Sequence, residues 1–156
     1  MSTEFLPATQ SSVGRTSTTA EPATDPAHFE ADALVVFLCT DGIGQGAAAS
    51  LDQATNGLLR QLIKQGDLTG KPYECVSLFA PTGLACQQLL VVGVGAATEI
   101  NAGLLYRAAA TAARQLASRP RQRIGFLAEG SWTNEQLEQA VAGGAVGMVG
   151  QDLYRA

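Results

Sequence analysis

Residues 33–39 read ALVVFLC, an unbroken apolar run rich in β-branched side chains. A strand with one solvated face alternates apolar and polar residues, whereas an apolar run without alternation is typical of a strand covered on both faces. Residues 87–95, QQLLVVGVG, have the same character. Such strands need helices on both sides of their sheet, so the sequence predicts an α/β domain with three layers, α/β/α.

Two further strands are expected beside these runs. Residues 73–80, YECVSLFA, precede the 87–95 run, and the short connection contains Pro81 and Gly83, so we expect an antiparallel hairpin. Residues 123–128, RIGFLA, form another short apolar strand. Strands that alternate with helices usually run parallel, so an antiparallel hairpin among them makes the sheet mixed.

The first helix is expected to start at Ser50, because Ser50 and Gln53 have the spacing of a capping box. An apolar stripe continues through Leu59 and Leu62, and Gly66 suits the left-handed position after a helix. This pattern predicts one continuous helix from Ser50 to about Lys64.

A second helix is expected at residues 99–118. A third helix is expected after a second capping box, formed by Thr133 and Gln136. Gly143 and Gly144 lie inside the last helix, where each glycine costs about 1 kcal/mol relative to alanine. We expect close approach of another backbone to offset that cost.

The N-terminal residues 1–28 are rich in Ser, Thr, Ala and Pro. They cannot bury enough apolar surface to offset their ordering entropy, so we predict a largely disordered tail, followed by a folded domain at 29–156. Within this tail, the sequence also allows a short strand around residues 3–8, docked on the sheet edge.

The charge balance argues against a nucleic-acid partner. Ten Lys and Arg face fourteen Asp and Glu, for a net charge of −4. No apolar run approaches the length of a membrane span, so neither a nucleic acid nor a membrane is an expected partner. Cys39, Cys75 and Cys86 have no C-x-x-C spacing. We therefore expect reduced, packed thiols and a cytoplasmic location.

Two glycine turns could hold a phosphate. Gly42, Gly44 and Ala47 satisfy G-x-G-x-x-A after a strand, and a second glycine turn follows residue 92. The acidic residue that would hold a ribose is not in place, because Asp67 precedes a strand rather than ending one. A tight structural turn is therefore the favoured interpretation. The candidate ligand-binding residues are Asp41, Gly42, Gly44, Gly46, Gly93 and Gly95.

No residue qualifies as catalytic or as a metal ligand. His28 is the only histidine and falls in the predicted tail, where its position could not be held for catalysis. Asp32 precedes the first apolar strand and Asp41 follows it, so these two carboxylates should lie at opposite ends of the strand.

The order of the motifs resembles the N-terminal domain of the leucyl aminopeptidase family, also called cytosol aminopeptidases. The resemblance covers residues 31–156 and rests on the "ADALVVFL" run, the "GDLTGK" connection, the "LLVVGVG" strand, an alanine-rich helix and the closing "AVAGGAVGMVGQDLYRA".

The resemblance implies a mixed-sheet domain similar to the macro-domain fold, placed ahead of a separate catalytic domain. In the family that second domain binds two divalent metal ions, Zn or Mn, and carries an N-T-D-A-E-G-R motif that this sequence lacks. The chain by itself is then expected to be noncatalytic. Its expected partners are its own C-terminal catalytic domain and further copies in a hexamer, contacted through the last helix and the Trp132 turn.

Two other functions are considered. A stand-alone macro-like module would use the glycine turns to bind ADP-ribose or another phosphate compound. A nicotinamide-dependent Rossmann enzyme ranks last, because it requires a fully parallel sheet and an acidic ribose contact.

Overall fold

The computed structural model describes residues 3–6, 21–23 and 25–154, and the surroundings of side chains from 25 to 147. Its sheet has six strands in the spatial order β2-β1-β6-β3-β5-β4. β3 pairs in parallel with β5 and β6, while β4 and β1 run antiparallel to β5 and β6, so the sheet is mixed, as predicted. The strands are β1 (Thr3–Leu6), β2 (Glu21–Ala23), β3 (Ala33–Cys39), β4 (Cys75–Phe79), β5 (Gln88–Gly95) and β6 (Ile124–Ala128).

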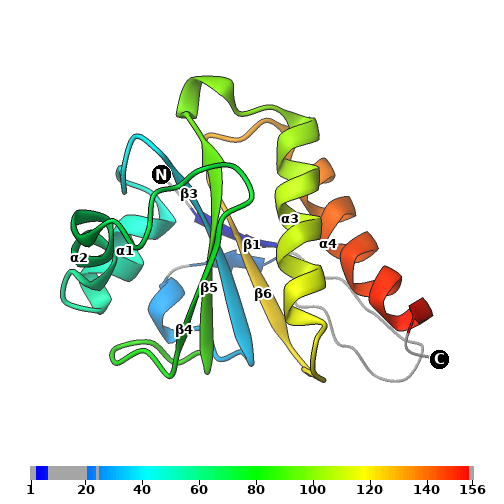
Figure 1. Cartoon of the computed structure of the whole chain (residues 1–156), viewed down its shortest axis with the longest axis horizontal. Coiled ribbons are helices and arrows are strands. Elements are labelled where there is room, and N and C mark those ends of the chain that lie inside the picture. The colour runs from blue at the N-terminus through cyan, green and yellow to red at the C-terminus, as the bar shows by residue number, and fades with distance from the viewer. Residues whose placement is uncertain (1–2, 7–20, 24, 155–156) are drawn as a thin grey trace.

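Helices cover both faces of this sheet, which confirms the predicted three layers (Figure 1). One face carries the short helices α1 (Ala47–Ala54) and α2 (Leu58–Gln65), and the other carries α3 (Ala102–Leu116) and α4 (Asn134–Tyr154). Two 3-10 turns, η1 (Pro26–His28) and η2 (Ala97–Glu99), complete the described elements.

The central strand β3 is buried on both faces, as its unbroken apolar run predicts. Val35 and Phe37 belong to the core shared with α3 and α4. Leu34, Val36 and Leu38 belong to the core shared with α1 and α2. Because successive side chains alternate between faces, one run of residues supplies both cores.

The expected hairpin is also present. β4 and β5 pair antiparallel, with Ser77 opposite Leu90. Every residue of β5 is buried, while β4 is only partly covered. This difference follows from position, because β4 is the last strand of the sheet on its side.

The prediction of one helix capped at Ser50 is wrong. Ser50 lies within α1, where its N–H donates to the Gly46 carbonyl at 3.2 Å, and the cap is Gly46. The chain then breaks between α1 and α2, because Asn56 and Gly57 adopt φ of 57° and 80°. These left-handed conformations cannot continue a right-handed helix.

The side chain of Asp52, in α1, contacts the first turn of the second helix. Its Oδ1 accepts from the N–H of Arg60 at 3.0 Å, in the first turn of α2. A side chain from one helix therefore satisfies a free backbone donor of the next. The predicted end of this region is confirmed, since Gly66 is left-handed at φ 83°.

The third and fourth helices follow the predicted pattern. α3 begins slightly later than expected, at Ala102, where Asn101 accepts from the N–H of Leu104 at 2.9 Å. The capping box before α4 is confirmed: Thr133 Oγ1 accepts from the N–H of Gln136 at 3.1 Å, and Gln136 Oε1 accepts from the N–H of Thr133 at 2.9 Å.

Gly143, inside α4, allows the close backbone approach that was expected, whereas Gly144 meets a side chain. A Cβ on Gly143 would overlap the carbonyl oxygen of Tyr106, in the backbone of α3. A Cβ added to Gly144 would lie 3.4 Å from Cζ of the Phe126 ring on β6, which is an ordinary side-chain contact. Glycine at 143 therefore lets α4 approach α3 backbone to backbone.

The N-terminal region contains ordered elements. β1 confirms the short strand expected around residues 3–8, and it pairs with β6. Ala27 in η1 is buried, so packed structure begins before residue 29. The interpretation of 1–28 as a largely disordered tail falls mostly outside the described residues and stays a prediction.

Candidate functional site

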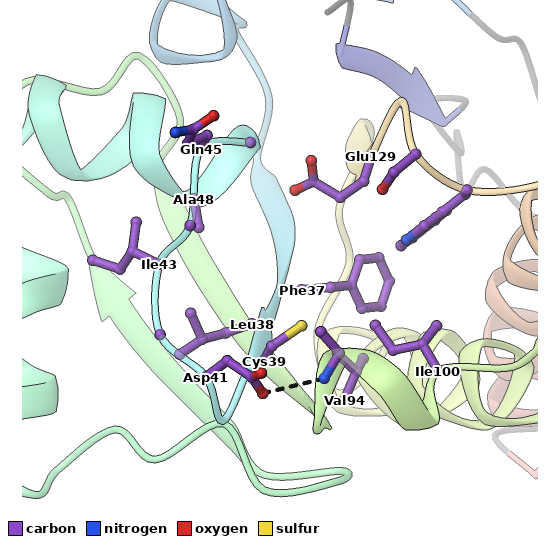
Figure 2. A pocket seen from close by; sticks show the side chains of 16 residues that line it. Phe37, Leu38, Cys39, Asp41, Ile43, Gln45, Ala48, Val94, Ile100 and Glu129 are labelled. Carbon is purple, nitrogen blue, oxygen red and sulfur yellow. Dashed lines mark hydrogen bonds between the residues drawn. The ribbon is translucent and has the colours of Figure 1, made fainter.

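A pocket of about 270 Å³ opens at the C-terminal end of β3 (Figure 2). Four segments converge on it: the end of β3, the glycine loop before α1, the β5–η2 junction and the β6–α4 connection. Its lining consists of Phe37, Leu38, Cys39, Asp41, Gly42, Ile43, Gly44, Gln45, Gly46, Ala48, Val94, Ala97, Ile100, Glu129, Ser131 and Trp132.

The topology explains why a pocket forms there. After β3 the chain enters α1 on one face of the sheet, whereas after β5 it enters α3 on the other face. Neighbouring parallel strands whose helices leave on opposite faces open a crevice at their carboxyl ends. The pocket occupies this switch point, where open α/β sheets commonly bind ligands.

One wall of the pocket is aromatic and aliphatic. The rings of Phe37 and Trp132 meet edge to face, with centroids 5.4 Å apart and planes at 62°. Val94 and Ile100 lie beside Phe37 (Figure 2). Trp132, whose turn was expected to contact a partner, is half-buried against the core of the α3 and α4 face.

The glycine loop forms a tight turn. Gly42 and Gly44 have φ of 112° and 65°, a region that residues with a Cβ rarely adopt. The N–H of Gly42 donates to the carbonyl of Cys39 at 3.2 Å. These glycines are therefore accounted for by backbone geometry.

Glu129 fills the position at the start of α1 that a phosphate would take. Both of its carboxylate oxygens accept from the N–H of Ala47, at 3.1 and 3.3 Å. A Cβ on Gly46 would overlap this carboxylate. Burial raises the pKa of Glu129, and the Ala47 hydrogen bond offsets only part of that rise. The protein thus supplies its own anion to this helix N-terminus.

Asp41 ties the end of β3 to η2. Its Oδ1 accepts from the N–H of Ala97 at 3.2 Å, the bond drawn in Figure 2, and from Thr40 Oγ1 at 3.4 Å. The pKa of the nearby Cys39 thiol is raised, first by burial and then by the charges of Asp41 and Glu129. Asp41 and Glu129 thus both place a carboxylate close enough to Cys39 to disfavour its thiolate.

The structure brings four of the six candidate residues together: Asp41, Gly42, Gly44 and Gly46 line the pocket. Gly93 and Gly95, the other two candidates, are not among the residues that line the pocket. A Cβ on Gly93 would overlap the carbonyl oxygen of Lys71, and Gly95, at φ 80°, faces the Pro72 ring. Because these two glycines lack side chains, the 66–72 connection can pack against the end of β5.

Sequence reasoning missed Glu129 as a site residue. The signal that could have found it is its place directly after a buried strand, because polar residues at strand carboxyl ends collect at one sheet edge. Finding it also required that β6 lie beside β3.

The remaining polar candidates lie apart. His28 is exposed and contacts Asp25 at 2.5 Å. Asp32 accepts from the N–H of Arg123 at 3.0 Å, at the other end of β3 from Asp41, as expected. Within residues 3–6, 21–23 and 25–154, no group of three or more His, Cys, Asp or Glu could hold a metal ion. In the same part of the chain, no helix has the length and hydropathy to span a bilayer.

Comparison with known proteins gives a consistent picture. A family model described as the cytosol aminopeptidase family, N-terminal domain, matches residues 35–155. A probable cytosol aminopeptidase of Rhodopirellula baltica is 32% identical over 109 residues, which cover 70% of this chain and 21% of the relative. One of Azoarcus sp. is 38% identical over 93 residues, covering 60% of this chain and 19% of the relative. The chain thus spans about a fifth of these relatives' length.

Proposed function

The chain belongs to the cytosol aminopeptidase family as its N-terminal domain, and from that premise we propose that it is a noncatalytic domain that packs on a catalytic domain and supports assembly of a hexamer. The parent enzyme would be a cytoplasmic aminopeptidase whose two divalent metal ions, Zn or Mn, are held by the catalytic domain. The resemblance drawn from the order of sequence motifs is confirmed.

The observation that carries the packing proposal is the outer side of α4. Near its start this side is acidic and exposed, at Glu135 and Glu138. Two turns further along, the same side carries Ala142 and Val146, and Val146 is 51% exposed. A helix whose outer side turns from charged to apolar is suited to contact another protein surface. α4 lies at the edge of the fold, beyond α3 (Figure 1).

A chimera tests this assembly role. This chain would replace the matching N-terminal segment of the Rhodopirellula baltica relative, and sedimentation would give the mass of the assembled particle. We expect Val146→Asp to lower that mass, because a carboxylate cannot be buried unpaired in an apolar contact. Glu138→Gln, on the charged part of the same helix, is the matched control. A mass unchanged by Val146→Asp would overturn the role of α4.

The noncatalytic part of the proposal has its own test. The 156-residue chain, incubated with Mn²⁺ or Zn²⁺, should not hydrolyse leucine-p-nitroanilide. Hydrolysis that survives further purification and follows the protein peak would show that the chain carries its own active site.

The alternative of an ADP-ribose module is not favoured by the geometry. Glu129 takes the N–H of Ala47, and the charged side chains lining the pocket are the carboxylates of Asp41 and Glu129. A diphosphate would meet like charge there. We expect calorimetric titration with ADP-ribose to show no binding. A dissociation constant below about 100 μM would favour the module instead.

A further inference from the structure

The pocket at the end of β3 combines apolar walls with negative charge. Phe37, Val94, Ile100 and Trp132 supply hydrophobic surface. Among the described residues that line it, the formal charges are the carboxylates of Asp41 and Glu129, and none is Lys or Arg. Small apolar pockets with a few convergent polar groups are the usual form of ligand sites.

The two carboxylates lie apart within the pocket. Figure 2 shows Glu129 near the start of α1 and Asp41 beside η2. In this view the height of the Phe37 ring falls between those of the two carboxylates. Each carboxylate contributes to the raised pKa of the Cys39 thiol, so both act electrostatically on the same space. Their hydrogen-bond donors are backbone N–H groups and, for Asp41, the Thr40 hydroxyl, so those contacts bring no cation into the pocket.

The size of the pocket limits its ligand. At about 270 Å³ it is slightly smaller than the sites that enclose drug-sized molecules, so it suits a single ring with a short polar arm. An anionic arm would be repelled, whereas an ammonium group would gain a charge-assisted hydrogen bond to a carboxylate and, near an aromatic face, cation–π attraction.

We propose that this pocket binds a small organic ammonium ion with an aromatic or branched aliphatic body, its charge held by Glu129 and its body packed between Phe37, Ile100 and Trp132. This inference does not rest on the role proposed for α4. Its ligand would engage the opposite side of the Glu129 carboxylate from the Ala47 N–H, since a carboxylate can accept several hydrogen bonds.

Trp132 provides a direct readout, because it is the only tryptophan in the chain and it lines the pocket. The test uses the whole 156-residue chain and three probes of similar shape: 2-phenylethylamine, the neutral 2-phenylethanol and the anionic 3-phenylpropanoate. We expect the amine to change Trp132 fluorescence with a dissociation constant of about 1 mM or below. The alcohol should bind about tenfold more weakly and the anion more weakly still.

Variants identify the group responsible. Glu129→Gln keeps an acceptor for the Ala47 N–H and should weaken amine binding about tenfold while leaving the alcohol unchanged. Asp41→Asn is a second variant, expected to weaken the amine less because its charge already faces the Ala97 N–H. Glu135→Gln, exposed on α4 outside the pocket, is the matched control and should change nothing.

Four results would overturn the proposal: no fluorescence change with the amine up to about ten times the expected dissociation constant, equal binding of all three probes, preferred binding of the anion, or amine binding that is insensitive to Glu129→Gln. None of these results bears on assembly through α4, which is measured separately by sedimentation.

Discussion

Glu129 binds the backbone N–H of Ala47 with both carboxylate oxygens, at 3.1 and 3.3 Å, although 82 residues separate them in the chain. The contact fastens the first turn of α1 to the end of β6. It also requires glycine at position 46, because a Cβ there would occupy the space of the carboxylate. The start of α1 is therefore held by a residue from another part of the sheet.

Gly46→Ala should destabilise the protein by about 1–2 kcal/mol, because the carboxylate must move and Ala47 loses its acceptor. Urea unfolding measures the loss. In a Glu129→Ala background the same substitution should cost distinctly less, since no carboxylate is then in the way. An equal cost in both backgrounds would show that the two residues are not coupled.

Glu129 should also make stability depend on pH. Its pKa is raised by burial above the usual 4.5, so the folded state keeps this proton at pH values where the unfolded state has released it. Stability from this group is therefore greatest below pH 4.5 and falls as pH rises through the folded pKa. Glu129→Gln removes the effect, so the variant should gain stability relative to wild type as pH increases.

Urea unfolding of both proteins between about pH 4 and pH 8 provides the measurement. Glu135→Gln corrects for the loss of one negative charge, since Glu135 is exposed on α4. A stability difference between wild type and Glu129→Gln that stays constant over this range would contradict the burial of the carboxylate.

Local patterns predicted those parts of the fold that local forces decide. The unbroken run of β3 required cover on both faces, and the Thr133–Gln136 capping box involves only neighbours in sequence. The Ser50 capping box has the same spacing, yet its prediction was wrong. At that site the start of the helix is set by the contact of Glu129 with the Ala47 N–H. This tertiary contact outweighs the local motif.

The candidate site divides in the same way. Asp41, Gly42 and Gly44 lie within four positions of one another in sequence, and a strand followed by glycines indicated the turn without reference to the rest of the fold. Glu129 and Trp132 reach the pocket only because β6 lies beside β3. Strand order is a property of the whole sheet, and no local spacing in the sequence records it.

Asp52 should be important for the joint between α1 and α2. Its side chain is 4% exposed and accepts from the N–H of Arg60, so Asp52→Ala leaves a helix donor unsatisfied and should cost about 2 kcal/mol in unfolding free energy. Asp52→Asn keeps an oxygen acceptor and should cost less.

Arg60→Ala separates this cap from the neighbouring ion pair. Arg60 Nε lies 3.3 Å from Asp52 Oδ2, but the arginine side chain is 72% exposed, so its loss should cost below about 1 kcal/mol. If Arg60→Ala proved as costly as Asp52→Ala, the ion pair rather than the cap would hold the joint together.

Gly143→Ala should be among the most destabilising alanine substitutions in α4. The added Cβ would overlap the carbonyl oxygen of Tyr106, and because that atom belongs to the backbone of α3, relief requires moving a whole helix. We expect a loss of about 2–3 kcal/mol in unfolding free energy, read from the urea midpoint.

Gly103→Ala in α3 is the matched control, since its Cβ would have Asn101 Oδ1 as its nearest neighbour at 3.4 Å. That variant should gain about 0.5 kcal/mol from helix propensity. Equal effects of the two substitutions would show that α3 and α4 are not in backbone contact at Gly143.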